Sequence, residues 1–88
     1  MKHYRIRVFG KVQGVWFRQS TMEKARQLGL AGKAENMPDG SVDIEVEGDE
    51  ENLQKLIAWC QQGPEHAIVE DISFSEGEPK NYKDFSIS

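Results

Sequence analysis

The spacing of apolar residues changes abruptly near residue 17, and this change most constrains the fold. Residues 2–9 alternate apolar and polar side chains, which is typical of a strand with one face on a core. From residue 17 the apolar-facing positions recur every three or four residues, as on one face of a helix: Phe17, Thr21, Met22, Ala25 and Leu28. Gly29 is suited to end this helix, because glycine readily adopts a left-handed conformation.

The rest of the chain repeats these two patterns. Residues 32–37 and 41–47 predict two strands, joined by the turn Pro38-Asp39-Gly40. Asp49 is expected to cap a second helix that ends near Gly63. A fourth strand is predicted over 67–74 and a short fifth over 85–87, without an indication of the sheet edge that the fifth one joins.

This β-α-β-β-α-β order with one extra strand predicts an α+β sandwich. We expect one domain over residues 1–88, with a mostly antiparallel sheet of four to five strands and two helices on one face. The first two strands should run in the same direction, because a helix crosses over between them. Their ends then lie at the same end of the sheet.

RNA-recognition domains and small regulatory ligand-binding domains share this element order, since a fold does not fix a function. RNA binding requires stacking aromatic residues and basic strands on the open sheet face. In the third strand Val42, Ile44 and Val46 are predicted to face inward. The open face is then expected to carry acidic residues that would repel phosphates: Asp43, Glu45 and Glu47.

The composition of this 88-residue chain narrows the class further. A net charge of −4 and an isoelectric point near 5.1 disfavour binding to nucleic acid or to an anionic membrane. No apolar run approaches the roughly 18 residues of a membrane span, and Arg5 and Arg7 interrupt the N-terminal run, unlike in a signal peptide. The single cysteine excludes an internal disulfide and favours the cytoplasm.

Neither the cysteine nor the histidines predict a site of their own. Cys60 continues a helical apolar stripe, which favours a buried thiol over a reactive one: Leu53, Leu56, Ile57 and Cys60. His3 and His66 are far apart in sequence and match no metal-ligand spacing, so no metal site is expected.

The segment between the first strand and the first helix, residues 10–18, is the strongest candidate for a binding site. Gly10 and Gly14 allow a tight bend, and the helix start directs unpaired N–H groups toward one point where an anion is favoured. Arg18 adds a permanent charge with forked donors suited to phosphate or carboxylate. The alternative is an ordinary turn, since the spacing matches neither the dinucleotide-binding fingerprint nor the P-loop.

The charge distribution favours the anion site. Residues 1–22 carry five basic residues and no acid, a net charge of +5, whereas residues 23–88 carry fifteen acids against six bases, a net charge of −9. Such a separation preserves a local positive potential around the loop. A strand with two solvated arginines, Arg5 and Arg7, would contribute to the same asymmetry without a site.

Asn36 is expected beside this loop, because it lies near the end of the second strand. Its amide can donate one hydrogen bond and accept another, so it could hold a water molecule against a bound phosphate. The alternative is a residue that favours the turn before Pro38.

Together these segments resemble an acylphosphatase over essentially the whole chain. The likeness rests on Gly-x-Val-Gln-Gly-Val-x-Phe-Arg at 10–18, Leu28-Gly29-Leu30, Asn36, Asp39-Gly40-Ser41-Val42, Glu47-Gly48, Gly63-Pro64 and Phe85-Ser86-Ile87. It implies a ferredoxin-like fold and the hydrolysis of carboxyl–phosphate anhydrides of small acyl phosphates, without a metal or cofactor. Inorganic phosphate or sulfate would be expected to occupy the same site.

The resemblance also implies roles for individual residues. Arg18 and Asn36 match the catalytic arginine and asparagine, and the phosphate-binding loop matches Gln13, Gly14, Val15, Trp16, Phe17 and Arg18. Lys33, Glu35 and Trp16 depart from the family pattern, and Trp16 either narrows the mouth of the site or lies on the surface. A catalytically silent relative that senses metabolites is the main alternative function, and nothing in the sequence requires more than a monomer.

Overall fold

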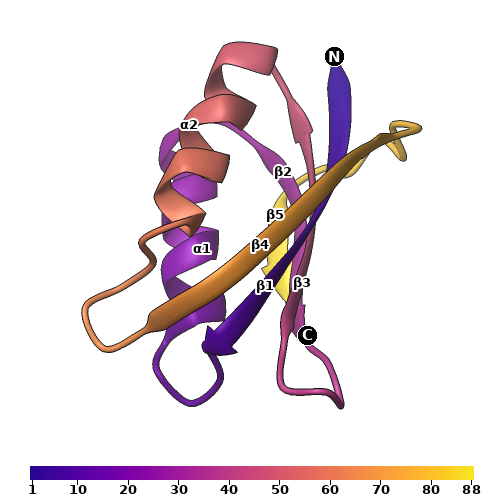
Figure 1. The fold of residues 1–88 in the computed structure, drawn as a ribbon. Helices are drawn as coiled ribbons and strands as arrows, with labels where there is room; N and C mark the ends of the chain where they lie inside the picture. Colours follow the sequence, from indigo (N-terminus) through magenta and orange to yellow (C-terminus); the bar gives the residue numbers. More distant parts are fainter.

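The computed structural model describes residues 1–88, which form five strands and two helices (Figure 1). The strands are β1 (Lys2–Lys11), β2 (Ala31–Asn36), β3 (Val42–Gly48), β4 (Ile68–Gly77) and β5 (Phe85–Ile87). The helices are α1 (Phe17–Gln27) and α2 (Glu50–Cys60). Neither helix is long and apolar enough to cross a membrane.

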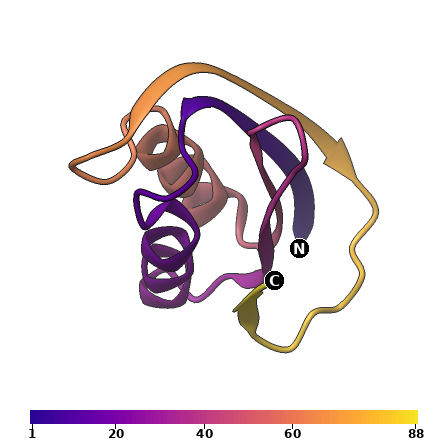
Figure 2. The same ribbon diagram turned by 90° about the horizontal axis from the view of Figure 1, so that it is seen from below.

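All five strands belong to one sheet in the order β4-β1-β3-β2-β5. β3 lies between β1 and β2 and is antiparallel to both, so β1 and β2 run in the same direction. β5 pairs in parallel with β2, which makes the sheet mixed and identifies the edge that the fifth strand joins. Both helices cover one face of the sheet (Figure 2), and the predicted α+β, ferredoxin-like sandwich is confirmed.

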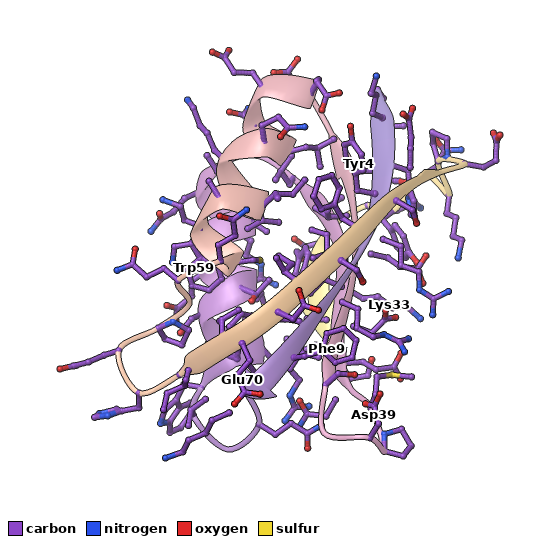
Figure 3. The ribbon with its side chains drawn as sticks, viewed as in Figure 1. Tyr4, Phe9, Lys33, Asp39, Trp59 and Glu70 are labelled. Carbon is purple, nitrogen blue, oxygen red and sulfur yellow. The ribbon has the colours of Figure 1, made fainter.

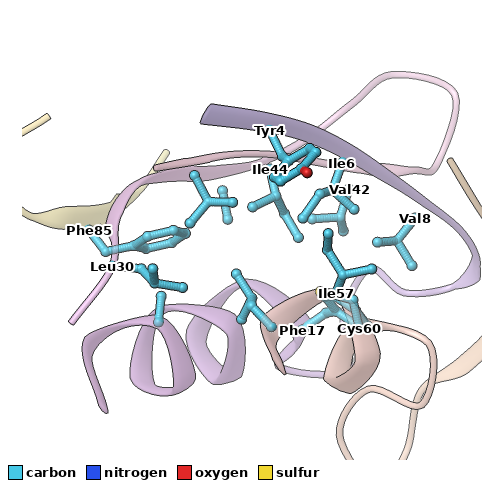
Figure 4. Packing of buried hydrophobic residues seen from close by; sticks show 14 of the residues in the cluster. Tyr4, Ile6, Val8, Phe17, Leu30, Val42, Ile44, Ile57, Cys60 and Phe85 are labelled. Carbon is cyan, nitrogen blue, oxygen red and sulfur yellow. The ribbon is translucent and has the colours of Figure 1, made fainter. Parts of the chain in front are cut away.

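The core lies between the helices and the inner face of the sheet (Figure 4). Alternate residues of β1 and β3 supply its upper layer, among them Ile6, Val8 and Ile44, all fully buried. Phe17 of α1 and the apolar stripe of α2 supply the other layer, and Cys60 belongs to this stripe as predicted. Burial raises the pKa of the Cys60 thiol to about 12, which leaves it an uncharged core residue.

The helix ends largely follow the sequence signals. The N–H of Leu30 donates to the carbonyl of Ala25 (2.9 Å) and the N–H of Gly29 to that of Arg26 (3.1 Å), while Gly29 has a φ of 70°. These bonds form a Schellman motif at the predicted end of α1. Asp49 occupies the N-cap position of α2, but its side chain makes no capping hydrogen bond.

Strands β1 and β4 are longer than predicted because they pair along their whole length. Their register runs from His3 opposite Gly77 to Lys11 opposite Ile68 and is interrupted by a bulge between Phe9 and Gly10. β4 therefore continues three residues beyond the predicted end at residue 74.

The acidic residues of β3 do face away from the helices, but they are not exposed. Asp43, Glu45 and Glu47 retain only 3%, 7% and 2% of their accessible surface. The guanidinium of Arg5 donates two hydrogen bonds to Asp43 (3.1 and 3.2 Å), and Arg7 donates a third (3.4 Å). The expectation of an open acidic face is therefore wrong. The alternative of two solvated arginines does not hold either, because both bind Asp43.

Glu45 and Glu47 are covered by residues 78–84, a segment that runs outside the sheet from β4 to β5 (Figure 2). Lys80 binds Glu45 through its Nζ atom (2.7 Å) and Glu47 through its backbone N–H (2.8 Å). Nδ1 of His3 lies 2.9 Å from Glu47 Oε2, and the Tyr82 ring stacks on the imidazole. We call residues 78–84 the strap.

Candidate active site

A cavity of about 320 Å³ opens where the β1–α1 loop meets the end of β2. Its lining comes from four parts of the chain: the β1–α1 loop, the first turn of α1, the end of β2 and β5. The residues are Val12, Gly14, Trp16, Phe17, Arg18, Gln19, Asn36 and Ile87. The loop and the β2–β3 hairpin lie at the same end of the molecule (Figure 1), as predicted from the parallel direction of β1 and β2.

The start of α1 has the features of an anion site. Trp16 is the N-cap residue, and no side chain forms a capping hydrogen bond there. The first-turn N–H groups therefore remain available, and the first turn holds no acidic residue that would compete with a bound anion. Gly14 and Trp16 have φ angles of 73° and 66°, so the loop curls tightly before the helix begins.

Arg18 lines this cavity from the first turn of α1. Its guanidinium takes part in none of the ion pairs within the molecule. Its Nη1 donates to the backbone oxygen of Ser88, whose own N–H donates to the carbonyl of Ala34 (3.0 Å). The guanidinium thus has an anchor beside β5 while its charge is not neutralised by an acidic side chain.

Asn36 is the last residue of β2 and pairs with Val42 across the hairpin. It is half-buried and lines the same cavity as Arg18. The hairpin turn behind it is held by Asp39, whose carboxylate accepts bonds from the N–H (2.9 Å) and the hydroxyl (2.5 Å) of Ser41. Both bonds lower the pKa of Asp39 below its ordinary value, and the bond from the Ser41 hydroxyl has the larger effect.

The side chain of Gln13 does not enter the cavity. Its Nε2 donates to the carbonyls of Met37 (2.8 Å) and Ser41 (2.9 Å), and so connects the β1–α1 loop to the hairpin that carries Asn36. Val15 also points away from the cavity and is buried in the core. Any contact of these two residues with an anion would therefore have to come from their backbone.

Among the residues that depart from the family pattern, only Trp16 reaches the cavity. Lys33 lies on the side of the sheet that faces away from the helices (Figure 3), where its Nζ is 3.9 Å from carboxylates of both Glu35 and Glu45. Glu35 is not among the lining residues, as strand alternation predicts. Trp16 is 73% exposed and is one of the lining residues.

Three lining residues, Val12, Gln19 and Ile87, were not among the residues predicted for the site. Gln19 follows Arg18 in the first turn and carried no signal of its own. Ile87 belongs to the predicted fifth strand, but its position depends on which sheet edge that strand takes. No group of three or more histidine, cysteine or acidic side chains is arranged to hold a metal ion.

The fold and the site together define a class: a small α+β sandwich in which an uncapped helix start and an asparagine line one cavity. The family model described as acylphosphatase matches residues 4–87. Over 76 residues, 86% of this chain, the chain is 46% identical to an acylphosphatase of Marinobacter nauticus, of which the match covers 83%. It is also 46% identical to that of Shewanella amazonensis, with coverage of 100% and 98%.

The fold is equally close to a solved member of the family. The crystal structure of acylphosphatase from Bacillus subtilis superimposes with a TM-score of 0.97 at 39% identity, covering 100% of this chain and 99% of that one. The chain therefore belongs to the acylphosphatase family. It is a hydrolase of the acylphosphatase type.

Proposed function

We propose that Arg18 and the backbone N–H groups of residues 15–18 bind the phosphoryl group of a small acyl phosphate, while Asn36 orients the attacking water. The observation that carries the proposal is the common cavity, which the uncapped start of α1, Arg18 and Asn36 all line. Gln13 and Gly14 contribute to the shape of the loop.

The reaction suits a site built for binding and orientation. Water attacks phosphorus, the bond from phosphorus to the acyl oxygen breaks, and the acyl group leaves as a carboxylate. Because a carboxylate is already a good leaving group, alignment of the water and neutralisation of the phosphoryl charge do most of the catalysis. Charge-assisted hydrogen bonds such as those of Arg18 contribute about 1.5–3 kcal/mol each.

The lining residues also suggest where the proton goes. None of them is an aspartate, a glutamate or a histidine, so the cavity wall carries no ordinary general base. The amide of Asn36 accepts one hydrogen bond and donates another but takes no proton at neutral pH. The water proton therefore passes to an oxygen of the phosphoryl group.

Two substitutions test these roles. Arg18→Ala is expected to abolish both turnover of acetyl phosphate and binding of inorganic phosphate, whereas Arg18→Lys keeps the charge without the fork and should restore part of the binding. Asn36→Ala is expected to lower kcat by about 10²-fold or more and to leave the inhibition constant of phosphate nearly unchanged. Steady-state kinetics with phosphate as a competitive inhibitor measure both quantities.

Two outcomes would contradict the proposal. Wild-type turnover in Asn36→Ala would remove the water-orienting role. A wild-type protein that binds phosphate but hydrolyses no acyl phosphate would instead be a ligand-binding relative. Glu65→Gln, at an exposed position outside the cavity, serves as the control that should change neither quantity.

The compartment and the assembly state are part of the proposal. A single buried cysteine without a disulfide suits the reducing cytoplasm. We further propose a monomer, because a single chain supplies both Arg18 and Asn36 to the cavity and the site needs no residue from a second copy. Light scattering at the concentrations used for the assays would test the monomer, and a dimer under those conditions would contradict it.

A further inference from the structure

The candidate cavity is larger than a phosphoryl group requires. Its volume of about 320 Å³ lies at the lower end of the range typical of small-molecule pockets and would accommodate roughly ten water molecules. A phosphoryl group has only a few heavy atoms, and the proposed anion site occupies one side of the cavity. The remaining space is available to the acyl group of the substrate.

Half of the residues that line this cavity are apolar. Four of the eight lining residues are hydrophobic, and Val12 and Phe17 are buried beneath the surface as parts of the core. Trp16 and Ile87 instead form the accessible part of this apolar lining, with 73% and 38% of their surface exposed. These two are among the few large hydrophobic residues that the protein leaves exposed, and both lie at this cavity.

The backbone that carries the Trp16 indole is held in a defined position. Its neighbours Val15 and Phe17 are both buried in the core, which fixes the backbone on either side. The backbone carbonyl of Trp16 accepts the first hydrogen bond of α1 from Ser20 (2.9 Å). A tryptophan at a φ of 66° is unusual, because side chains other than those of glycine, asparagine and aspartate disfavour this conformation. Core packing alone does not explain an indole held there in solvent.

We propose that Trp16 and Ile87 bind the acyl group, so that this protein prefers acyl phosphates with an apolar and above all an aromatic acyl group. This inference rests on the proposed function. An aromatic acyl group can stack on the indole in an offset arrangement and bury apolar surface. An acetyl group offers a single methyl to the same wall.

The number of charged residues in the cavity lining also limits which acyl groups can bind. Arg18 is the only charged residue that lines the cavity, and the phosphoryl group uses it. An acyl group with a second carboxylate would therefore meet no cation of its own on this wall. The selected substrate is an uncharged apolar acyl group, with the anionic end at Arg18 and the apolar end at the indole.

The test compares kcat/KM for benzoyl phosphate with kcat/KM for acetyl phosphate. The benzoyl-to-acetyl ratio is expected to exceed one in the wild type and to fall about fivefold or more in Trp16→Asn and Trp16→Gly. Both replacements suit the left-handed backbone, so they remove the indole without adding strain to the loop. Trp16→Phe keeps an aromatic face and should hold the ratio within about twofold of the wild-type value.

A matched control and a binding measurement complete the test. Ile68→Ala removes a hydrophobic side chain of similar exposure (60%) outside the cavity and should leave the ratio unchanged. Binding of phenylphosphonate relative to methylphosphonate, measured by calorimetry, should decrease with the same variants. These phosphonates are not hydrolysed, so this arm does not depend on turnover.

The possible outcomes separate the inference from the proposed function. An unchanged ratio and unchanged phosphonate preference in Trp16→Asn and Trp16→Gly would overturn the inference, while turnover of both substrates would leave the proposed function intact. If the wild type hydrolyses neither substrate but prefers phenylphosphonate through Trp16, the proposed function fails and the apolar binding site stands. If it hydrolyses neither and shows no preference, both fail.

Discussion

At the scale of single residues, Gly10 and Gly14 illustrate how two similar sequence signals come from different physical needs. A Cβ atom on Gly10 would lie 2.2 Å from the carbonyl oxygen of Ile68, because β4 passes against the bulge at this position. A Cβ atom on Gly14 would meet no atom within 4 Å, and its φ of 73° alone favours glycine. Gly10 is therefore required for the close pairing of β1 with β4, and Gly14 for the left-handed turn of the loop at the cavity.

Alanine substitutions should separate these two needs. Gly10→Ala is expected to lower the free energy of unfolding by more than about 3 kcal/mol, because the clash is with backbone that cannot move cheaply. Gly14→Ala should cost only about 1–2 kcal/mol of backbone strain, but it adds a methyl group to the cavity lining and should raise KM. Urea denaturation and steady-state kinetics measure the two effects. The opposite order of destabilisation would contradict this assignment.

At the scale of elements, the site depends on the relative position of the β1–α1 loop and the β2–β3 hairpin. The Gln13 side chain is the direct polar link between them, through its two bonds to Met37 and Ser41. Asn36 lies just before this pair of carbonyls in the chain. In the proposed complex, the distance between the phosphoryl group on the loop and the water on Asn36 would therefore depend on Gln13.

Gln13→Met keeps a similar length and removes both donors. We expect kcat to fall about tenfold or more, since displacement of a reacting group by about 1 Å has effects of up to 10², with little change in phosphate inhibition. Gln54→Met, on the exposed face of α2, is the matched control. In the Asn36→Ala background the effect of Gln13→Met should largely vanish, because residues that act together are not additive. Full additivity would show that Gln13 acts elsewhere.

At the scale of the whole molecule, the strap buries a cluster of polar side chains on the outer face of the sheet, among them Glu45 and Glu47. Burial alone would raise the pKa of Glu47, but His3 and the N–H groups of Lys80 and Tyr82 outweigh burial and hold this pKa below its ordinary value of 4.5. The pKa of Glu45 is lowered in the same way: burial alone would raise it, and the ion pair with Lys80 is the main interaction that outweighs burial. The charged forms of both carboxylates thus stabilise the folded state.

The sign of the pH dependence follows from these lowered pKa values. The stabilisation is complete above the unfolded-state value near 4.5 and is lost as the pH falls through the lower folded-state pKa values. The free energy of unfolding in urea should therefore be flat between about pH 7 and 5.5 and decline below about pH 4.5. Glu47→Gln should be less stable at neutral pH and decline less steeply, whereas Glu65→Gln should follow the wild type. Equal slopes in all three would contradict the role of Glu47.

Local patterns predicted the elements well because most of them are locally determined. The alternation of Val42, Ile44 and Val46 identifies the inner face of β3, and Gly29 identifies the end of α1. The meeting of Arg18 with Asn36 at one cavity also followed from strand direction, even though β3 separates β1 from β2.

The features that escaped prediction depend on contacts between distant segments. The spacing of Asp43, Glu45 and Glu47 is that of exposed residues. They are buried only because the Arg5 side chain covers the first and the strap covers the other two. The side-chain direction of Gln13 and the position of Ile87 depend in the same way on where the hairpin and β5 come to lie. Local periodicity contains no information on such paths.

The position of β1 in the sheet has a consequence for how the chain acquires its structure. β1 is the earliest strand in the sequence, yet its two neighbours are β3 and β4, the latter beginning only at Ile68. Both pairings close long stretches of chain, whose entropy must be lost before the contacts compensate for it. Folding is therefore expected to be slow for a chain of this length, and β1 keeps one open hydrogen-bonding edge until β4 docks.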